Sequence, residues 1–304
     1  MINKKKILIV LGGISKEREI SKQTGQACFK ALLKEGLNLS KCDLKSNFKK
    51  TIKSYNPDII LNCLHGEFGE DGKAQSIFEN LKIPYTHSGP KSSKIAMNKI
   101  LSKQIFSKNK ILTPDFKIIK RISDLKNKIS LKKFVIKPIN EGSSVDVSIF
   151  DKLNKISKKK IFSLIRKYKV LLQEEYIEGK EVQAAVLVKK SIGAIEIKPK
   201  RKFYDYKAKY NSKAKTKHIM PANLKKNVYK KVNQIAFKAH KLLGCRGVTR
   251  SDFRVKPNGD IFILEVNTQP GMTKLSLVPE IAQHYGLSFT ELLYRLLKDA
   301  STKR

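Results

Sequence analysis

Four polar residues in the last fifth of the chain could do chemistry together, because a hairpin would bring them to one place. The segment Pro257-Asn258-Gly259-Asp260 is a turn signal between two apolar-rich runs. A loop centred on it pairs Asp252 with Glu265 and Arg250 with Asn267. Side chains alternate between the two faces of a strand, so these four are expected on one face. The opposite face is expected to carry Ser251, Phe253, Val255, Phe262, Leu264 and Val266.

Carboxylates that face each other across neighbouring strands repel unless a cation lies between them. Mg²⁺ is the expected cation, since it takes hard oxygen ligands from one or two carboxylates together with substrate phosphates. Asn267 would add a neutral oxygen, and Arg250 would balance phosphate charge. A solvated face of mixed charges would explain the pair alone, but its Arg and Asn neighbours favour a metal–phosphate site.

The segment that follows the hairpin contains Pro270-Gly271. Glycine permits close approach of the backbone, so the Gly271 N–H could stabilise an oxyanion. A plain Pro-Gly turn is the simpler interpretation of this dipeptide when it is taken by itself.

Length and composition limit the class of protein. The 304 residues suffice for two or three domains. With 40% hydrophobic and 30% charged residues, the chain is neither disordered, collagen-like nor a small disulfide scaffold. No apolar run approaches the roughly 18 residues that span a bilayer, and the run Ile7–Leu11 is too short for a signal peptide. Four dispersed cysteines form no paired spacing, so we expect a reduced cytoplasmic protein.

The formal net charge of +38 suggests a polyanionic partner at first sight. Only nine of the 64 basic residues are arginines, and the lysines are spread along the whole chain without an aromatic-interleaved stripe. A solvated coat of lysines, with no specific nucleic-acid partner and no membrane partner, is the expected interpretation.

Three segments differ in their pattern of elements, which predicts an α/β (α+β) chain of three domains. Residues 1–88 alternate strand and helix patterns, as in a parallel α/β layer. Residues 89–177 form a small central domain, and residues 178–304 form a C-terminal domain. The polar stretch 199–222 is unusually long for a loop, and such loops often act as lids. In the central segment, the pattern predicts a helix over 92–107 and strands over 134–137 and 145–150.

Residues 264–273, followed by Ser276-Leu277-Val278-Pro279, closely resemble the C-terminal signature of the D-alanine–D-alanine ligases, members of the ATP-grasp superfamily. Four further segments resemble the N-terminal motif, second motif, phosphate loop and mobile loop of that family, in this order: residues 11–19, 65–72, 137–145 and 203–210. The five matches stand in the family's order and spacing and cover essentially the whole chain. Such a set is very specific.

The resemblance implies a three-domain ATP-grasp fold with ATP bound between the last two domains. It implies that ATP drives the joining of two D-alanines through an acyl phosphate, to give D-alanyl-D-alanine for peptidoglycan precursors. It also implies a homodimer. This chemistry requires positioning and charge neutralisation more than a protein nucleophile.

The resemblance also assigns roles to single residues. Two Mg²⁺ ions, or Mn²⁺ in their place, would be held by Asp252, Glu265 and Asn267. ATP would be bound by Lys99, Lys137, Glu174, Tyr176, Ile177, Glu181 and Lys209. Catalysis is assigned to Glu17, Ser143, Tyr210, Arg250 and Gly271, and D-alanine binding to His65 and Ser276.

Two departures and three alternatives accompany this interpretation. Tyr176 stands where the family often has tryptophan, and Asp146 stands where many members have glycine, directly after the phosphate loop. A D-alanine–D-lactate ligase is the nearest alternative, and Tyr210 resembles the dipeptide-forming members instead. A polyanion-binding protein on a ligase fold is supported only by the net charge. A catalytically silent homologue is disfavoured by the intact metal, phosphate and loop residues.

Overall fold

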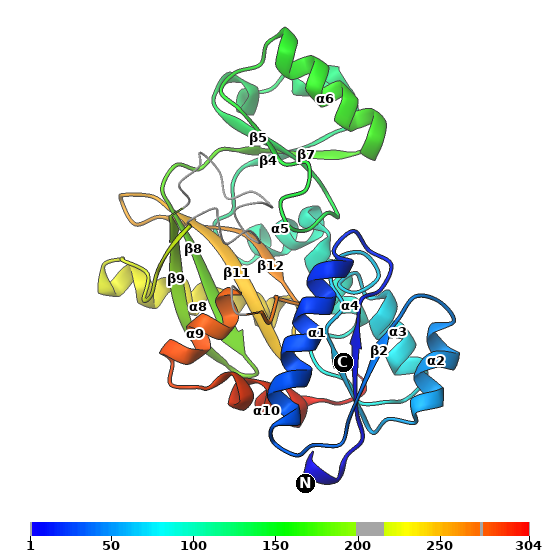
Figure 1. Ribbon diagram of the computed structural model, residues 1–304. Coiled ribbons are helices and arrows are strands. Elements are labelled where there is room, and N and C mark those ends of the chain that lie inside the picture. Colours follow the sequence, from blue (N-terminus) through cyan, green and yellow to red (C-terminus); the bar gives the residue numbers. More distant parts are fainter. Residues whose placement is uncertain (1, 199–215, 274–275, 304) are drawn as a thin grey trace.

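The computed structural model describes residues 2–198, 216–273 and 276–303, and these contain three β-sheets with helices packed against them (Figure 1). The first sheet has the order β2-β1-β3 and is parallel, as predicted. Its strands are β1 (Ile7–Leu11), β2 (Leu39–Asp43) and β3 (Ile59–Asn62). The 3₁₀ turn η1 (Ile2–Lys4) precedes it, and its helices are α1 (Arg18–Leu33), α2 (Phe48–Tyr55) and α3 (Lys73–Asn80).

The central strand of this sheet is apolar at every position because helices cover both of its faces. Ile7 and Ile9 of β1 lie in one hydrophobic core with residues of α1, while Leu8 and Val10 lie in another core with residues of α2 and α3. The period of two along β1 therefore divides the N-terminal region into two packed layers.

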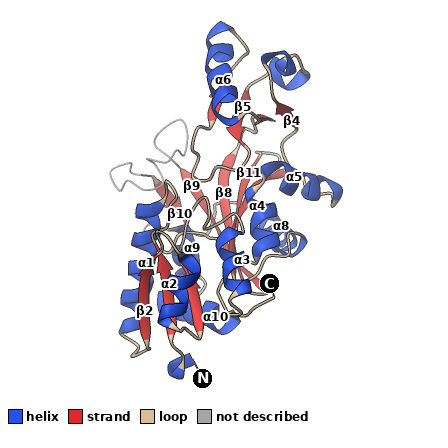
Figure 2. Ribbon diagram, turned by 90° about the vertical axis from the view of Figure 1, so that its right-hand side faces the viewer, coloured by secondary structure: helices blue, strands red, loops and turns tan. Residues whose placement is uncertain are grey.

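A second sheet, with the order β4-β7-β5-β6, is antiparallel and carries its own core. Its strands are β4 (Phe116–Ile119), β5 (Phe134–Pro138), β6 (Ser148–Phe150) and β7 (Leu171–Glu175). It is covered by α6 (Lys155–Tyr168), with the 3₁₀ turns η2 (Ile122–Leu125) and η3 (Lys128–Leu131) beside it. The buried residues of this core all come from residues 119–171. Figures 1 and 2 show the sheet and α6 standing away from the rest of the molecule.

The third sheet has the order β10-β9-β8-β11-β12 and is antiparallel. Its strands are β8 (Lys180–Leu187), β9 (Lys190–Lys198), β10 (Lys217–Ile219), β11 (Val248–Val255) and β12 (Ile261–Asn267). On one face lies α8 (Lys226–Leu242), and on the other lie α9 (Leu277–His284) and α10 (Phe289–Asp299). The short strand β10 falls inside the stretch 199–222 that the sequence pattern assigns to a loop, while residues 199–215 lie outside the described residues.

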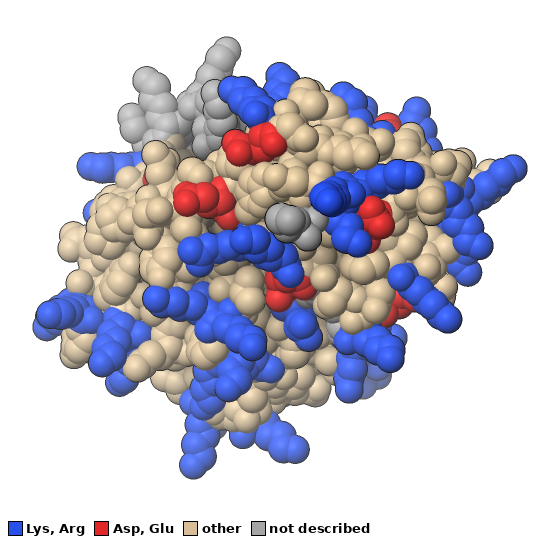
Figure 3. Space-filling view, turned by 90° about the horizontal axis from the view of Figure 1, so that it is seen from below, with Lys and Arg blue, Asp and Glu red and all other residues tan. Residues whose placement is uncertain are grey.

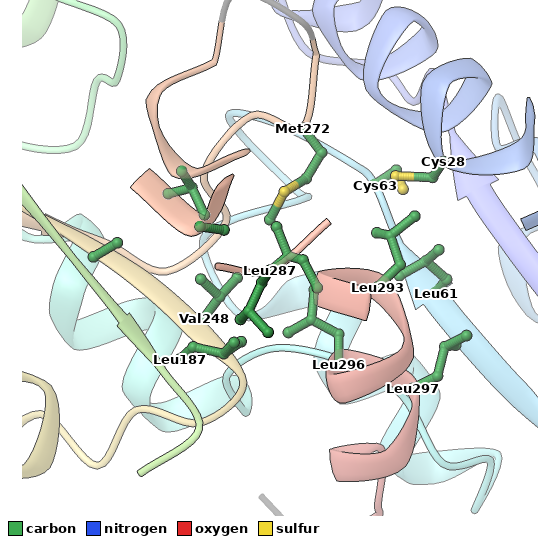
Figure 4. Packing of buried hydrophobic residues seen from close by; sticks show 14 of the residues in the cluster. Cys28, Leu61, Cys63, Leu187, Val248, Met272, Leu287, Leu293, Leu296 and Leu297 are labelled. Carbon is green, nitrogen blue, oxygen red and sulfur yellow. The ribbon is translucent and has the colours of Figure 1, made fainter. Parts of the chain in front are cut away.

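The first and third sheets share one hydrophobic core. Leu293 and Leu297 of α10 pack in the same cluster as Leu61 of β3 and Leu187 of β8. Figure 4 shows Leu293 beside Leu61, with Leu187 on the opposite side of α10. The backbone of Ser301 adds a bridge to Tyr85, so the C-terminal end of the chain is tied to the N-terminal region.

Two predicted elements of the central segment differ from the observed ones. The helix predicted over 92–107 is broken into α4 (Pro90–Met97) and α5 (Lys99–Lys108). Asn98 has an extended ψ of 101°, and its side chain accepts hydrogen bonds from the first free N–H groups of α5. Such a cap starts a new helix. The predicted strand over 145–150 begins only at Ser148, since three residues before it have positive φ: Ser143, Ser144 and Asp146.

Lysine and arginine side chains cover the face seen in Figure 3 as separate projections interrupted by acidic and uncharged residues. This distribution agrees, on that face, with the solvated coat expected from the sequence. Among the residues that the structure describes, no helix is long and apolar enough to cross a membrane.

Candidate active site

The hairpin of β11 and β12 brings the predicted acids together. Asp252 pairs with Glu265, and Arg250 pairs with Asn267, as the turn signal predicted. The register shifts by one residue after Asp252, so Phe253 pairs with Ile263. This β-bulge keeps the four polar residues in register while it changes the pairing nearer the turn.

Because of the bulge, the predicted composition of the opposite face is wrong for part of β12. Ile261 and Ile263 are buried in the core with Phe253, whereas Phe262 and Leu264 are only partly buried. Leu264 lines the same cavity as Asp252 and Glu265. A shift of one residue exchanges the faces of a strand, and that is the reason for the error.

Both acids of this carboxylate pair, Asp252 and Glu265, contact side-chain cations. The Arg250 guanidinium donates two hydrogen bonds to Asp252, from Nε to Oδ1 at 2.8 Å and from Nη2 to Oδ2 at 3.0 Å. The Lys99 ammonium lies 3.3 Å from Glu265 Oε2 and donates to the Glu141 carbonyl at 2.7 Å. Two cations therefore offset the repulsion that the facing carboxylates would otherwise suffer.

Two adjoining cavities meet at the carboxylate pair. The first, of about 640 Å³, is lined by residues of all three predicted segments, among them Glu17, His65, Ser143, Arg250, Asn267 and Gly271. The second, of about 780 Å³, lies between the second and third sheets and is lined by Lys137, Glu174, Tyr176, Ile177, Glu181 and Asp252, among others. Lys99, Glu141 and Glu265 line both. A group held in one cavity can thus reach a group held in the other.

A second charged group, the lysine cluster, consists of Glu174, Lys103 and Lys137. Glu174 and Lys137 line the second cavity, and Lys103 is buried against Glu174. Lys103 Nζ lies 2.8 Å and Lys137 Nζ 2.6 Å from the Glu174 carboxylate. Burial alone would raise the pKa of Glu174, but the two ammonium groups outweigh it and lower the pKa. Burial lowers the pKa of Lys103 to about 8.

The sequence interpretation missed Lys103, which is buried against the cavity-lining Glu174. It lies one turn after Lys99 in α5, and its ammonium also donates to Thr113 Oγ1 at 2.5 Å. The helical spacing of four from Lys99 was the available signal, but it is hidden among many lysines.

Tyr176 and Glu181 line the same cavity near its mouth. Lys133 Nζ lies 4.3 Å and the Arg254 guanidinium 5.8 Å from the centre of the Tyr176 ring. Arg254 also forms an ion pair of 3.1 Å with Glu181 on β8. The neighbouring Ile177 is buried. These residues form an aromatic and charged wall that suits a heterocycle and its sugar.

The loop between β5 and β6 reaches across to the N-terminal region. The Ser143 hydroxyl donates to Glu17 Oε2 at 2.8 Å, and Lys16 lies 3.4 Å from Glu141. Glu17 stands directly before α1 and is nearly buried. Ser143 and Glu17, both assigned to catalysis by the family resemblance, are therefore in contact. Two other predicted residues, Lys209 and Tyr210, lie outside the described residues.

His65 is held on both sides at the floor of the first cavity. Its Nε2 lies 3.0 Å from Thr24 Oγ1, and its Nδ1 lies 3.1 Å from Glu70 Oε1. Glu70 was noticed in the sequence only as part of a motif, and the structure adds it to the cavity lining. The ring orientation of His65 is fixed by these two neighbours.

Gly271 lines the first cavity, and the Ser276 hydroxyl lies close to Gly271. A Cβ atom on Gly271 would lie 2.8 Å from Ser276 Oγ, so a larger residue would displace that hydroxyl. Ser276 Oγ accepts a hydrogen bond from the Thr273 N–H at 2.9 Å. The close approach explains the choice of glycine at this position.

The oxygen donors at the junction of the cavities fit a hard divalent cation. Within the described part of the chain, no three His, Cys, Asp or Glu residues gather as a metal-binding group. The carboxylates of Asp252 and Glu265 are joined instead by the amide of Asn267, whose Oδ1 accepts a hydrogen bond of 2.7 Å from the Gln269 N–H. Two carboxylates and an oriented amide oxygen suit Mg²⁺ and not a metal that prefers nitrogen or sulfur.

Two antiparallel sheets that hold a cavity lined by lysines and carboxylates between them define the class of ATP-grasp enzymes. Comparison with known proteins narrows the class. The family model "D-ala D-ala ligase C-terminus" matches residues 106–298. The chain is also 54% identical, over 309 aligned residues and 99% of both chains, to the D-alanine–D-alanine ligase of Pelagibacter ubique (strain HTCC1062). The chain therefore belongs to the D-alanine–D-alanine ligase family.

Solved structures agree with this membership. The crystal structure of D-alanine–D-alanine ligase from Bacillus anthracis is similar with a TM-score of 0.85 and 31% identity, and 96% of each chain is covered. The same enzyme complexed with ATP is similar with a TM-score of 0.81 and 29% identity over 96% of each chain.

Proposed function

We propose that this chain is the ATP-dependent ligase that joins two D-alanines to D-alanyl-D-alanine for peptidoglycan precursors. The observation that carries the proposal is the carboxylate pair, which lies where two cavities of different lining meet. The full-length identity to a D-alanine–D-alanine ligase supports the choice of substrates.

On the nucleotide side, the second cavity would hold ATP. Lys99 and Lys137 would bind its phosphates, because their ammonium groups line the cavity next to the carboxylates. The adenine edge would contact Glu174 and the backbone of Ile177, its ring face would contact Tyr176, and the ribose hydroxyls would bind Glu181.

Two Mg²⁺ ions, or Mn²⁺, would be held by Asp252, Glu265 and Asn267 and would neutralise phosphate charge when bound. Lys209 would contribute a further ammonium. Arg250 and Lys99, which pair with Asp252 and Glu265, would exchange part of this pairing for contacts to phosphate oxygens.

On the amino-acid side, the first cavity would hold both D-alanines. Glu17 would bind the ammonium of the first, with His65 lining the same cavity. Ser276, which lies close to Gly271, would bind the carboxylate of the second. The first carboxylate attacks the γ-phosphorus, which forms an acyl phosphate and releases ADP. The amine of the second D-alanine then attacks the acyl carbon, loses a proton and displaces phosphate.

Arg250 and the Gly271 N–H would stabilise the oxyanion that develops on the attacked carbon, since both line the first cavity. The acyl phosphate must be protected from water. The contact between Ser143 and Glu17 closes one side of the cavity, and Tyr210 would join it from the stretch that the structure leaves undescribed.

The proposal includes the setting of the enzyme. The three domains would divide near residues 88 and 177, with ATP between the second and third. The enzyme would act in the cytoplasm, where ATP is present, as a homodimer. The family resemblance implies the homodimer, and the dispersed cysteines favour the cytoplasm.

Phosphate release over a panel of D- and L-amino acids and D-lactate tests the function. Release is expected only with ATP, Mg²⁺ and D-alanine together, and D-lactate is expected to compete poorly as the second substrate at neutral pH. Asp252→Asn is expected to abolish release, whereas Asp260→Asn at the exposed hairpin turn is the matched control and should retain it. Wild-type protein that binds ATP but releases no phosphate with D-alanine would contradict the proposal.

Measuring how binding to nucleic acid depends on salt distinguishes the proposed ligase from the alternative, a polyanion-binding protein. We expect weak, sequence-blind binding that disappears as salt rises, as a lysine coat alone would give. Tight, sequence-specific binding without ligase activity would instead favour the alternative.

A further inference from the structure

Asp146, the residue that departs from the family pattern, adopts a backbone conformation that favours glycine. Its φ is 54°, in the left-handed region, and Ser143 and Ser144 before it have φ of 50° and 61°. A side chain at such a position carries a steric cost that glycine avoids. Aspartate is one of the residues that tolerate the conformation, but tolerance alone gives no advantage over glycine.

The Asp146 carboxylate has two partners at the C-terminal end of α6. Its Oδ2 accepts a hydrogen bond from Lys167 Nζ at 2.6 Å and one from Tyr168 Oη at 2.5 Å. These bonds lower the pKa of Asp146, and burial together with the bond to Asp146 raises the pKa of Tyr168 to about 12. At neutral pH the carboxylate therefore stays an acceptor and the phenol stays a donor.

The partners stand on a rigid support. Ile161 and Leu164 of α6 are buried in the core of the second sheet, so the end of the helix is fixed relative to that sheet. At the other end of the loop, Ser143 contacts Glu17, and Lys99 holds the Glu141 carbonyl. The residues of those contacts line the first cavity, whereas Asp146 is not among its lining residues.

We propose that Asp146 is a positioning residue, which latches the phosphate loop (residues 141–145) to the end of α6 and keeps the loop ordered before nucleotide arrives. The Asp146 latch consists of Asp146, Lys167 and Tyr168. This inference rests on the proposed function, in which the loop binds the phosphates of ATP. With glycine at position 146 the end of the loop nearest α6 would lose this anchor, and nucleotide would have to order that end. Preordering lowers the part of the binding energy that is lost to ordering.

Removal of the latch should therefore weaken nucleotide binding more than folding. Asp146→Gly keeps the left-handed backbone and loses both bonds, so the Kd for nucleotide should rise about fivefold, as expected for a partly exposed charge-assisted contact. Asp146→Asn keeps the shape of the side chain and loses its charge, so the Kd for nucleotide should rise about twofold. Tyr168→Phe and Lys167→Met each remove one of the two bonds, so their Kd values should lie between those of the wild type and of Asp146→Gly.

The test is calorimetric titration of the full-length variants with Mg–ADP and with a non-hydrolysable ATP analogue, without D-alanine. Lys159→Met, an exposed lysine on the same helix outside the latch, is the matched control and should leave the Kd unchanged. In steady-state assays, Asp146→Gly should raise KM for ATP while KM for D-alanine stays the same. The double variant Asp146→Gly/Tyr168→Phe should bind nucleotide no more weakly than Asp146→Gly alone, because both changes remove the same interaction.

An unchanged Kd in Asp146→Gly, with only a lower Tm, would overturn the latch and leave a merely structural role. An equal rise in Lys159→Met would also overturn it, since general helix charge would then be the cause. The variants could show the predicted Kd ratios to wild type while the wild-type protein releases no phosphate. That result would contradict the proposed function and support the latch. Wild-type protein that binds no nucleotide would contradict both.

Discussion

The two charged groups beside the second cavity, the lysine cluster and the carboxylate pair, differ in how much water reaches them. In the lysine cluster, the side chains of Lys103 and Glu174 are 0% and 3% exposed. In the carboxylate pair, the Glu265 side chain is 26% exposed and the Asp252 side chain 10%. The lysine cluster has two cations for one acid, while the carboxylate pair with Lys99 and Arg250 has equal numbers of each sign.

This difference separates a permanent arrangement from an exchangeable one. Buried charges cannot lose a partner without a large cost, because no water replaces it. Partly hydrated charges can exchange partners at little cost. The lysine cluster is thus expected to hold the cavity in shape and leave one positive charge for a nucleotide, whereas the carboxylate pair is expected to exchange its side-chain cations for metal and phosphate.

The largest expected effect comes from breaking the exchangeable group. Glu265→Gln should lower kcat/KM by about a thousandfold, because the oxygen donors for the cation and the placement of phosphate are lost together. The free energy of unfolding should change by less than about 1 kcal/mol, since water reaches this side chain. Steady-state kinetics and urea denaturation measure the two quantities. A large loss of stability would show that this group too is structural.

Breaking the permanent group should lower the stability of the fold. Glu174→Gln leaves the ammonium groups of Lys103 and Lys137 buried without a carboxylate, and it should lower the free energy of unfolding by about 3 kcal/mol. Glu175→Gln, the next and partly exposed residue of β7, is the matched control and should change stability little. Denaturant titration of both variants checks the contrast. Equal stabilities would mean that the cluster is as replaceable as the carboxylate pair.

The smallest effect is a pH dependence that belongs to Lys103. Its folded pKa of about 8 lies below that of a lysine in an unfolded chain, so between these values the unfolded state binds more protons. Stability should therefore rise with pH above about 8, by at most about 1.4 kcal/mol per pH unit. Lys103→Met should lack this rise. The difference between wild type and variant in denaturant titrations from pH 7 to pH 10 measures it, and parallel curves would contradict the prediction.

The sequence predicted the parts of the site that depend on local signals. A turn signal and strand alternation are sufficient to pair Asp252 with Glu265, and this pairing is confirmed. The bulge after Asp252 could not be predicted, because one extra residue leaves no mark in the apolar pattern. The break at Asn98 depends on a side chain that caps one helix instead of continuing another.

Long-range burial explains the other misses. Nothing local distinguishes Lys103 from the surface lysines, since its burial results from strands that lie far along the chain. The resemblance to a family singled out Ser143 and Glu17, which are in contact, but it gave no account of Asp146, where the chain departs from the pattern. A departure of this kind has to be explained from contacts.

The shared core of the first and third sheets has a consequence for synthesis on the ribosome. The second sheet closes its core with residues 119–171 and can fold as soon as they emerge. The first sheet, although it is made first, exposes the face of β3 that α10 covers until residues 289–299 have left the ribosome. The earliest part of the chain must therefore wait for the latest, and during that interval its uncovered apolar face is the place where chaperones would be expected to bind.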